Sequence, residues 1–174
     1  VVYTTTEPTE ALMLGGNVVV MHEGRVLQVG PTAEVYQNPA TTQVAEVFSD
    51  PPINFLHGTI ADGTVRLGEN LSFAATKTMR DLEPGEYTFG IRSSQLDLAC
   101  PEEGCASIVG KIGLTEINGS ETFVHIEHEG AAIVVQENGV HSHRVGDQVS
   151  AYARPGAFYV FNTAGKLVAS PAKD

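Results

Sequence analysis

The chain has 174 residues, which is enough for one ordinary domain or for one domain and a fragment of another. Its 10 basic and 21 acidic residues give a net charge of −11, which argues against binding to nucleic acid or to an anionic membrane surface, because both depend on Lys and Arg. The apolar content of 42% is typical of a globular core, and no apolar run approaches the length of a membrane span.

The first fifty residues mix helix and strand signals. The predicted elements are a strand at 2–6, a helix at 10–14, a hairpin of strands 17–21 and 26–29, a helix that begins at Pro31 and stops before Pro39, and a helix at 41–48. Pro8 favours a helix start, and Gly15-Gly16 favours its end. Because a strand signal stands at the first residues with no Met before it, we expect the chain to be the carboxy-terminal part of a longer protein.

After Asp50-Pro51-Pro52 the pattern changes to strands and turns. Strands are predicted at 53–61, 63–67, 71–74, 86–92, 96–99, 106–117, 120–128, 131–136, 146–154 and 158–162. Many short strands separated by Gly and charged turn residues are typical of a small barrel or sandwich. The pattern therefore predicts two parts, residues 1–50 and residues 51–174.

An internal repeat is suggested by two short stretches. Residues 87–94 resemble residues 149–156, and each is a strand that ends in an arginine, Arg92 or Arg154, before a turn pair. Two similar half-barrels would explain the match. Each guanidinium could bind a carboxylate of the other half or an anionic ligand, and the structural ion pair is the favoured interpretation.

Three groups of residues together resemble a known family. They are 2–11 with 18–30, 34–39 running on to 50–55, and Gly90-Ile91-Arg92 with residues 116–122. The most specific part is Gly24-Arg25-x-x-Gln28-x-Gly30, followed by Glu34-x-Tyr36-x-x-Pro39. Together these stretches resemble the nucleotide-binding subunit of bacterial ABC importers for sugars, polyols and glycerol phosphate, the maltose-type group.

The resemblance implies a mainly β fold. Residues 51–174 are expected to form a tandem OB-type barrel of the TOBE or MOP-like kind, preceded at 1–50 by a small α/β remnant of the ATPase domain. It also implies partners: a second ATPase subunit, identical or unlike, and transmembrane permease subunits. The full complex would then be cytoplasmic and peripheral on the inner face of the cell membrane.

The parts of this family that handle ATP are not found in the sequence. It contains no G-x-x-x-x-G-K-[ST] phosphate loop, no apolar strand that ends in Asp-Glu and no signature motif. We therefore expect neither catalysis nor a cofactor in this chain, and ATP and Mg²⁺ in the full-length parent. Thr6 stands where the family carries a switch histidine, so that either the parent has a weakened ATP site or the alignment is displaced by one residue.

Three further candidates come from the family's turn between two barrel strands: Glu116, Gly119 and Glu121. They could form a regulatory or ligand-facing contact, or only a tight turn that needs glycine, with two solvated carboxylates. His125, His128, His141 and His143 are interpreted as structural side chains rather than a metal site, because His125 and His128 point to opposite faces of a regular strand.

The preferred function is a regulatory and dimerising module of an importer ATPase subunit, for a solute that the sequence does not name; the residues 7–16 most resemble importers of glycerol or similar small polyols. The alternative is a small-ligand module that binds a sugar or an oxyanion in an OB-type barrel mouth. A nucleic-acid-binding OB-fold is the weakest hypothesis, because the chain is acidic and lacks Trp.

Overall fold

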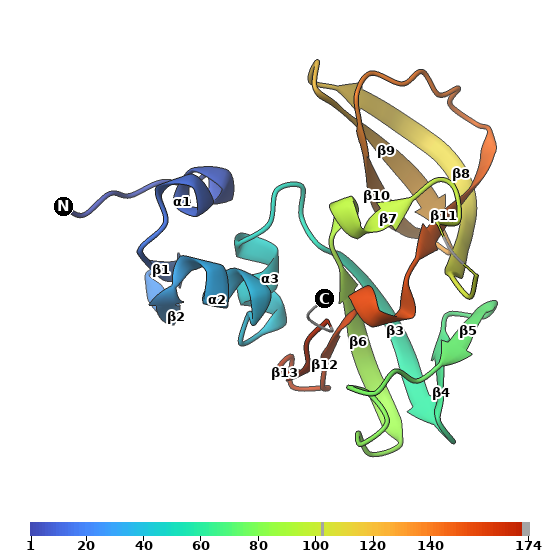
Figure 1. Cartoon of the computed structure of the whole chain (residues 1–174), viewed down its shortest axis with the longest axis horizontal. Helices are drawn as coiled ribbons and strands as arrows, with labels where there is room; N and C mark the ends of the chain where they lie inside the picture. Colours follow the sequence, from blue (N-terminus) through green and yellow to red (C-terminus); the bar gives the residue numbers. More distant parts are fainter. Residues whose placement is uncertain (102, 172–174) are drawn as a thin grey trace.

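The computed structural model describes residues 1–101 and 103–171. An α/β segment at the amino terminus lies beside a larger β region, and the two parts meet along one side of the β region (Figure 1). The mainly β architecture expected from the sequence is confirmed. Within the described residues, no helix has the length and apolar character needed to cross a membrane.

The amino-terminal segment is a hairpin covered by short helices. Its elements are α1 (Pro8–Leu14), β1 (Asn17–His22), β2 (Arg25–Pro31), α2 (Thr32–Gln37) and α3 (Thr42–Val47). Alternate side chains of a strand point to opposite faces, so one face of the hairpin packs on the helices. A small core results, formed by Val20, Val35, Val44 and Phe48. The Thr41 hydroxyl caps α3 by accepting a hydrogen bond from Val44 N at 3.2 Å.

The strand predicted at residues 2–6 is wrong. Residues 1–7 are exposed and belong to no helix or strand, and they do not pair with β1 or β2. A β-branched run forms a strand only where a neighbouring strand satisfies its backbone, and the described residues place none beside it.

The β region contains two antiparallel sheets. Its elements are β3 (Asn54–Ala61), β4 (Thr64–Leu67), β5 (Leu71–Ala74), β6 (Gly85–Ile91), η1 (Ser93–Gln95), β7 (Leu96–Asp97), β8 (Ala106–Ile117), β9 (Glu121–His128), β10 (Ala131–Asn138), β11 (Gln148–Ala153), η2 (Pro155–Ala157), β12 (Tyr159–Phe161) and β13 (Leu167–Ala169). The strand orders are β13-β12-β6-β3-β4-β5 and β10-β9-β8-β11-β7. Strand β13 was not predicted from the sequence.

The two sheets have the same topology, and they exchange their last strands. We call the two halves of this region units. The first unit contains β3, β4, β5, β6 and η1, and in chain order these correspond to β8, β9, β10, β11 and η2 of the second unit. Strand β7 follows β6 in the chain but pairs with β11, whereas β12 follows β11 and pairs with β6. The register repeats as well: Gly90↔Tyr159 in one sheet corresponds to Tyr152↔Asp97 in the other. The predicted half-barrel repeat is therefore present, with each half completed by a strand from the other.

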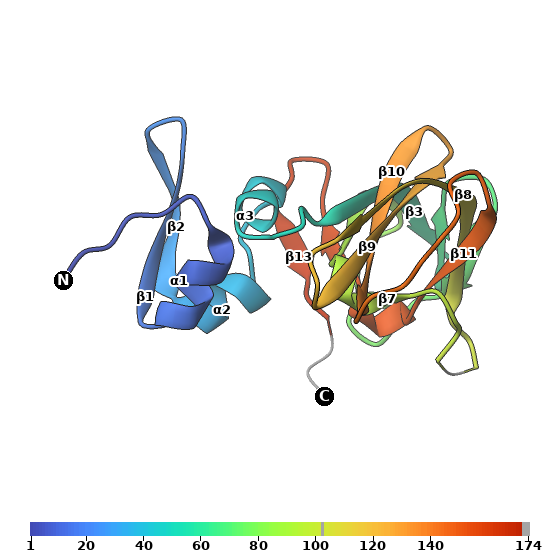
Figure 2. The same cartoon turned by 90° about the horizontal axis from the view of Figure 1, so that it is seen from above.

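One hydrophobic core joins the two units. It includes Leu56 and Phe89 from the first unit, Ile108 and Ile126 from the second, and Phe158 at the second crossing. Phe158 stacks on Phe73, with ring centroids 5.5 Å apart. Figure 2 shows the two units overlapping when they are viewed from above, with the amino-terminal segment to one side. Because the core is shared, neither unit is expected to fold alone.

Candidate functional site

Arg92, one of the predicted site residues, lies at the junction between the β region and the amino-terminal segment. It directly follows β6, and only 7% of its surface is exposed. Its Nη2 donates to the Tyr36 carbonyl at 2.7 Å, and its Nη1 donates to the Phe48 carbonyl at 3.3 Å and to Ser49 Oγ at 2.5 Å. The guanidinium also stacks on the Tyr36 ring, 3.5 Å from its centroid.

The acceptors of Arg92 explain how its charge is tolerated. Tyr36 lies in the last turn of α2, and Phe48 is the C-cap of α3. Helix C-termini carry unpaired carbonyls and a partial negative charge, so the guanidinium donates hydrogen bonds to the ends of both helices and offsets that charge. The ion pair favoured from the sequence is not found for Arg92 in the part of the chain that the structure describes, because two helix ends take the place of a carboxylate.

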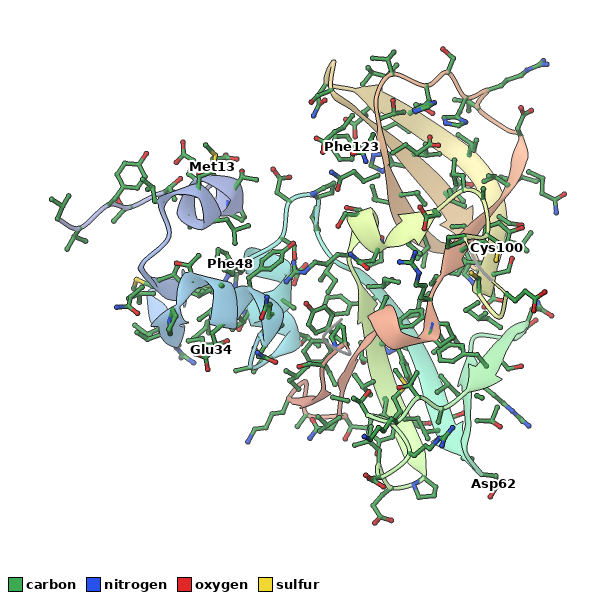
Figure 3. The ribbon with its side chains drawn as sticks, in the orientation of Figure 1. Met13, Glu34, Phe48, Asp62, Cys100 and Phe123 are labelled. Atoms are coloured by element: carbon green, nitrogen blue, oxygen red, sulfur yellow. The ribbon has the colours of Figure 1, made fainter. Side chains whose placement is uncertain are left out.

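A second set of contacts at the junction is made by backbone atoms. The β12–β13 hairpin lies against residues 38–42: Leu167 N donates to Ala40 O at 3.0 Å, and Thr42 N donates to Gly165 O at 2.9 Å. Beneath them, Ala45, Ile53, Tyr159 and Phe161 form a buried apolar cluster. Figure 3 shows Phe48 among the helices, on the side that faces the β region. The two parts of the chain are thus joined by polar and apolar contacts together.

One more of the predicted residues, Glu121, is linked to the neighbour of Arg92 by hydrogen bonds. Ser93 Oγ donates to Gln136 Oε1 at 3.2 Å, and Gln136 Nε2 donates to Glu121 Oε1. Glu121 also accepts from Asn118 Nδ2 at 3.1 Å. The turn itself has Gly119 at φ +96°, a conformation that favours glycine. Glu121 is therefore not a freely solvated carboxylate.

The remaining predicted residues lie apart from this network. Glu116 Oε2 is 2.6 Å from His125 Nε2, and 59% of the Glu116 side chain is exposed. Arg154 is exposed and precedes η2, as Arg92 precedes η1, but no segment of the described chain buries it. Of the two arginines, only Arg92 lies at the junction.

Thr6 is exposed, and it immediately precedes Glu7, the N-cap of α1. The polar contacts of this segment are made by its neighbours: Thr5 Oγ1 donates to Glu10 Oε2 at 2.5 Å, and Tyr3 OH donates to the same atom at 3.2 Å. The hydrogen bond to Glu10 raises the pKa of Tyr3 above its usual value.

The four histidines singled out in the sequence do not share one site, although the ring centroids of His141 and His143 lie 6.4 Å apart. His128 is buried and bonded to Val109 O at 2.8 Å, and His143 lies 2.5 Å from Glu137 Oε2. His141 Nε2 lies 2.8 Å from Asn138 O. Among the described residues, no three His, Cys, Asp or Glu side chains are grouped in a way that could hold a metal ion.

Sequence reasoning missed several residues that join parts of the molecule. Asn54 is 4% exposed and bonds both backbone groups of Val134, at 2.9 and 2.8 Å, which ties β3 to the edge strand β10. Gln136 and Ser49 were missed as well. A polar residue at an inward position of a predicted strand could have indicated a buried hydrogen bond. Of these three residues, Asn54 shows that signal.

A cavity of ≈ 170 Å³ lies beside this network. It is bordered by α1, by residues 48–51 between α3 and β3, and by η1, so both parts of the chain contribute to its wall.

Comparisons with known proteins place this geometry in a family. Residues 89–161, which include Arg92 and both strand crossings, match the TOBE domain. Over 170 residues the chain is 33% identical to the sn-glycerol-3-phosphate import ATP-binding protein UgpC 3 of Agrobacterium fabrum, covering 96% of this chain and 47% of that protein. It is also 33% identical over 153 residues to the UgpC protein of Ruegeria pomeroyi, covering 87% of this chain and 41% of that protein. The chain therefore carries a match to the TOBE domain, and over most of its length it is similar to ATP-binding subunits of import systems.

The chain spans about half the length of the curated relatives it matches. The region matched by the family model is the TOBE domain, not the ATPase core. Among solved structures, the cytoplasmic molybdate-binding protein ModG with molybdate bound is similar at a TM-score of 0.45 and 13% identity, covering 62% of this chain and 94% of that one. The tandem OB-type fold expected from the sequence is thus confirmed by the TOBE match together with the paired sheets.

Proposed function

We propose that this chain is the regulatory and dimerising carboxy-terminal region of the ATP-binding subunit of an ABC importer for sugars, polyols or glycerol phosphate. Residues 1–50 then belong to the ATPase domain and residues 51–174 form the regulatory domain. ATP and Mg²⁺ bind in the rest of the subunit, which works with a second ATP-binding subunit and with permease subunits at the cytoplasmic face of the membrane. The two relatives are named for the import of sn-glycerol-3-phosphate, which supports glycerol phosphate among these solutes.

The observation that carries the proposal is the rigid junction. Arg92 holds the ends of two helices, and the β12–β13 hairpin bonds to residues 38–42 through backbone atoms. The β region cannot rotate against the amino-terminal segment without breaking these contacts. A displacement of the ATPase domain is therefore transmitted to the barrel, and a constraint on the barrel is transmitted back.

Pairing of two subunits is supported by exposed apolar side chains on the second unit. Residues 139–146 run beside β8, because Gly139 N donates to Ser120 O at 2.7 Å and Gly146 N donates to Ile112 O at 2.7 Å. The large apolar side chains exposed on these two segments are Val109, Leu114, Ile117, Val140 and Val145, with Leu114 and Ile117 on opposite faces of β8. Where exposed apolar side chains gather they mark protein–protein contacts, and a second copy of the domain is the proposed partner of these side chains.

Light scattering of the chain across a dilution series tests the proposal. We expect the mass of a dimer at high concentration and a monomer for Leu114→Glu, because a carboxylate would lose its hydration in the interface. The matched control is Met13→Glu, an equally apolar-to-acidic change at an exposed position of α1. A monomeric wild-type chain at every concentration contradicts pairing through this domain.

The alternative, a ligand held in a barrel mouth, has weaker support. The inward positions of both units are filled by buried side chains of one core, among them Leu56, Phe89, Ile108 and Ile126. A sugar or oxyanion would have to displace side chains packed at the density of a protein interior.

A further inference from the structure

The cavity beside the junction, called the junction cavity below, is lined in part by polar side chains that form no hydrogen bond within the described residues. Thr9 comes from α1, Asp50 from the segment before β3, and Ser94 from η1; all three line the cavity and are exposed. Their side chains make no hydrogen bond within residues 1–101 and 103–171, whereas Ser49 and Ser93 beside them are already bonded. One carboxylate and two hydroxyls are therefore available from three separate segments.

An anion is a poor match for this cavity. Arg92 is the cationic side chain in its wall, but its Nη1 and Nη2 atoms already donate to Tyr36, Phe48 and Ser49. Its Nε atom, which has no partner among the described residues, is closed off from solvent. Asp50 adds a negative charge to the wall, and like charges repel. A ligand that needs a free guanidinium would have to dismantle the junction first.

A neutral ligand with several hydroxyls fits the same groups better. A hydroxyl donates to the Asp50 carboxylate, and it can both donate to and accept from Thr9 and Ser94. Leu12, Tyr36 and Phe48 supply apolar surface for the carbon skeleton. The volume of ≈ 170 Å³ is small for a cofactor pocket and admits only a compact molecule.

We propose that this cavity binds a small neutral polyhydroxyl compound of the size of a triol or pentitol. The compound bridges α1, the segment at Asp50 and η1, so it stabilises the docked arrangement of the two parts of the chain. Because α1 begins two residues after Thr6, this is a site at which such a molecule would regulate the subunit; that role rests on the proposed function, whereas the binding does not.

Nuclear magnetic resonance of the ¹⁵N-labelled chain tests the binding, with glycerol, xylitol and inorganic phosphate as separate probes. We expect at least one polyol to shift the amide signals of Thr9, Asp50, Ser94 and Gln136 in a saturable way, and phosphate to leave them unsaturated. Saturable shifts with phosphate and none with either polyol would overturn the assignment of ligand class. No saturable shift with either polyol in a folded chain would overturn the site.

Two conservative variants locate the contact. Asp50→Asn and Ser94→Ala should each weaken polyol binding by about threefold to tenfold, the usual effect of losing one hydrogen bond. Asp81→Asn and Ser72→Ala, at exposed positions of the first unit, are matched controls and should leave the affinity unchanged. Wild-type affinity in the double variant of Asp50 and Ser94 would place the ligand elsewhere and contradict the proposal.

The pairing of subunits and the polyol site can be contradicted independently of each other. Polyol binding by a chain that stays monomeric would contradict the pairing proposed above and leave the site intact. A dimer that gives no saturable polyol shift would contradict the site alone.

Discussion

The two units of the β region share one topology and one register, yet they treat the same arginine position differently. In each unit the fourth strand, β6 or β11, is followed by an arginine that precedes a short 3₁₀ helix. Arg92 is 7% exposed and bonded to the ends of two helices, while Arg154 is exposed. The local sequence pattern is the same, so the difference comes from what is docked outside.

The comparison shows that two units with the same fold can have different contacts and different proposed roles. The hydrogen bonds described above join the amino-terminal segment to the first unit, through Arg92 and the β12–β13 hairpin (Figure 1). The second unit carries the exposed apolar side chains of β8 and residues 139–146 instead. Under the proposed function, one unit receives movement from the ATPase domain and the other meets the partner subunit.

The largest expected effect on stability concerns the segments at which the chain crosses between the units, before β7 and before β12. At these segments the two units should behave alike. Leu96 and Phe158 occupy equivalent positions after η1 and η2, and they are 1% and 0% exposed. Phe158→Ala should cost about 4 kcal/mol and Leu96→Ala about 3 kcal/mol of unfolding free energy, because each leaves a cavity in the shared core. Each variant should lower the midpoint of one common urea transition. Two separate transitions in either variant would show that the units are independent.

A glycine pair offers a second test of equivalence. An added Cβ would lie 2.3 Å from Arg66 O at Gly58 and 2.4 Å from Glu127 O at Gly110. Alanine at either site should cost about 3 kcal/mol, because a neighbouring backbone must move. Gly85→Ala is the control: the nearest atom would be 4.0 Å away, so urea unfolding should change by about 0.5 kcal/mol or less. Unequal effects at Gly58 and Gly110 would weaken the proposed equivalence.

The arginine pair should separate the two units. Arg92→Ala is expected to cost about 2 to 3 kcal/mol, because three bonds from a charged donor are lost and two buried carbonyls lose a partner. Arg154→Ala should cost less than about 1 kcal/mol, as for an exposed side chain. Arg92→Lys should not rescue stability, because an ammonium lacks the planar fork that reaches three acceptors. Equal losses for the two alanine variants in urea unfolding would refute the assigned role of Arg92.

The smallest effect is expected in the turns that join the first two strands of each unit. Asn118 Oδ1 accepts from Glu121 N at 2.8 Å and from Ser120 N at 3.1 Å, so Asn118→Ala should cost about 1 kcal/mol. In the equivalent turn, Asp62 has φ +50° and no side-chain hydrogen bond within the described residues, so Asp62→Gly should be neutral or slightly stabilising. Thermal unfolding of both variants measures the difference. A destabilising Asp62→Gly would mean that this aspartate has a contact of its own.

Much of the fold could be predicted from the sequence because its signals are local. Strand β8 was predicted with its observed bounds, and the β1–β2 hairpin follows from its turn at residues 22–25. The repeat of a strand that ends in arginine indicated two half-barrels. The strand at 2–6 failed for the opposite reason: its composition is suitable, but a strand also requires a partner.

The sequence by itself determined the mainly β class, the family resemblance, the short repeat and the arginine at the end of each repeated strand. Only the tertiary structure decided that the units exchange β7 and β12, that Arg92 holds helix ends rather than a carboxylate, and that Ser93, Gln136 and Glu121 form one network. The physical reason is the distance along the chain over which each effect acts. Alternation and turn chemistry act between neighbours in the chain, whereas burial and hydrogen-bond partners depend on segments that meet only after folding.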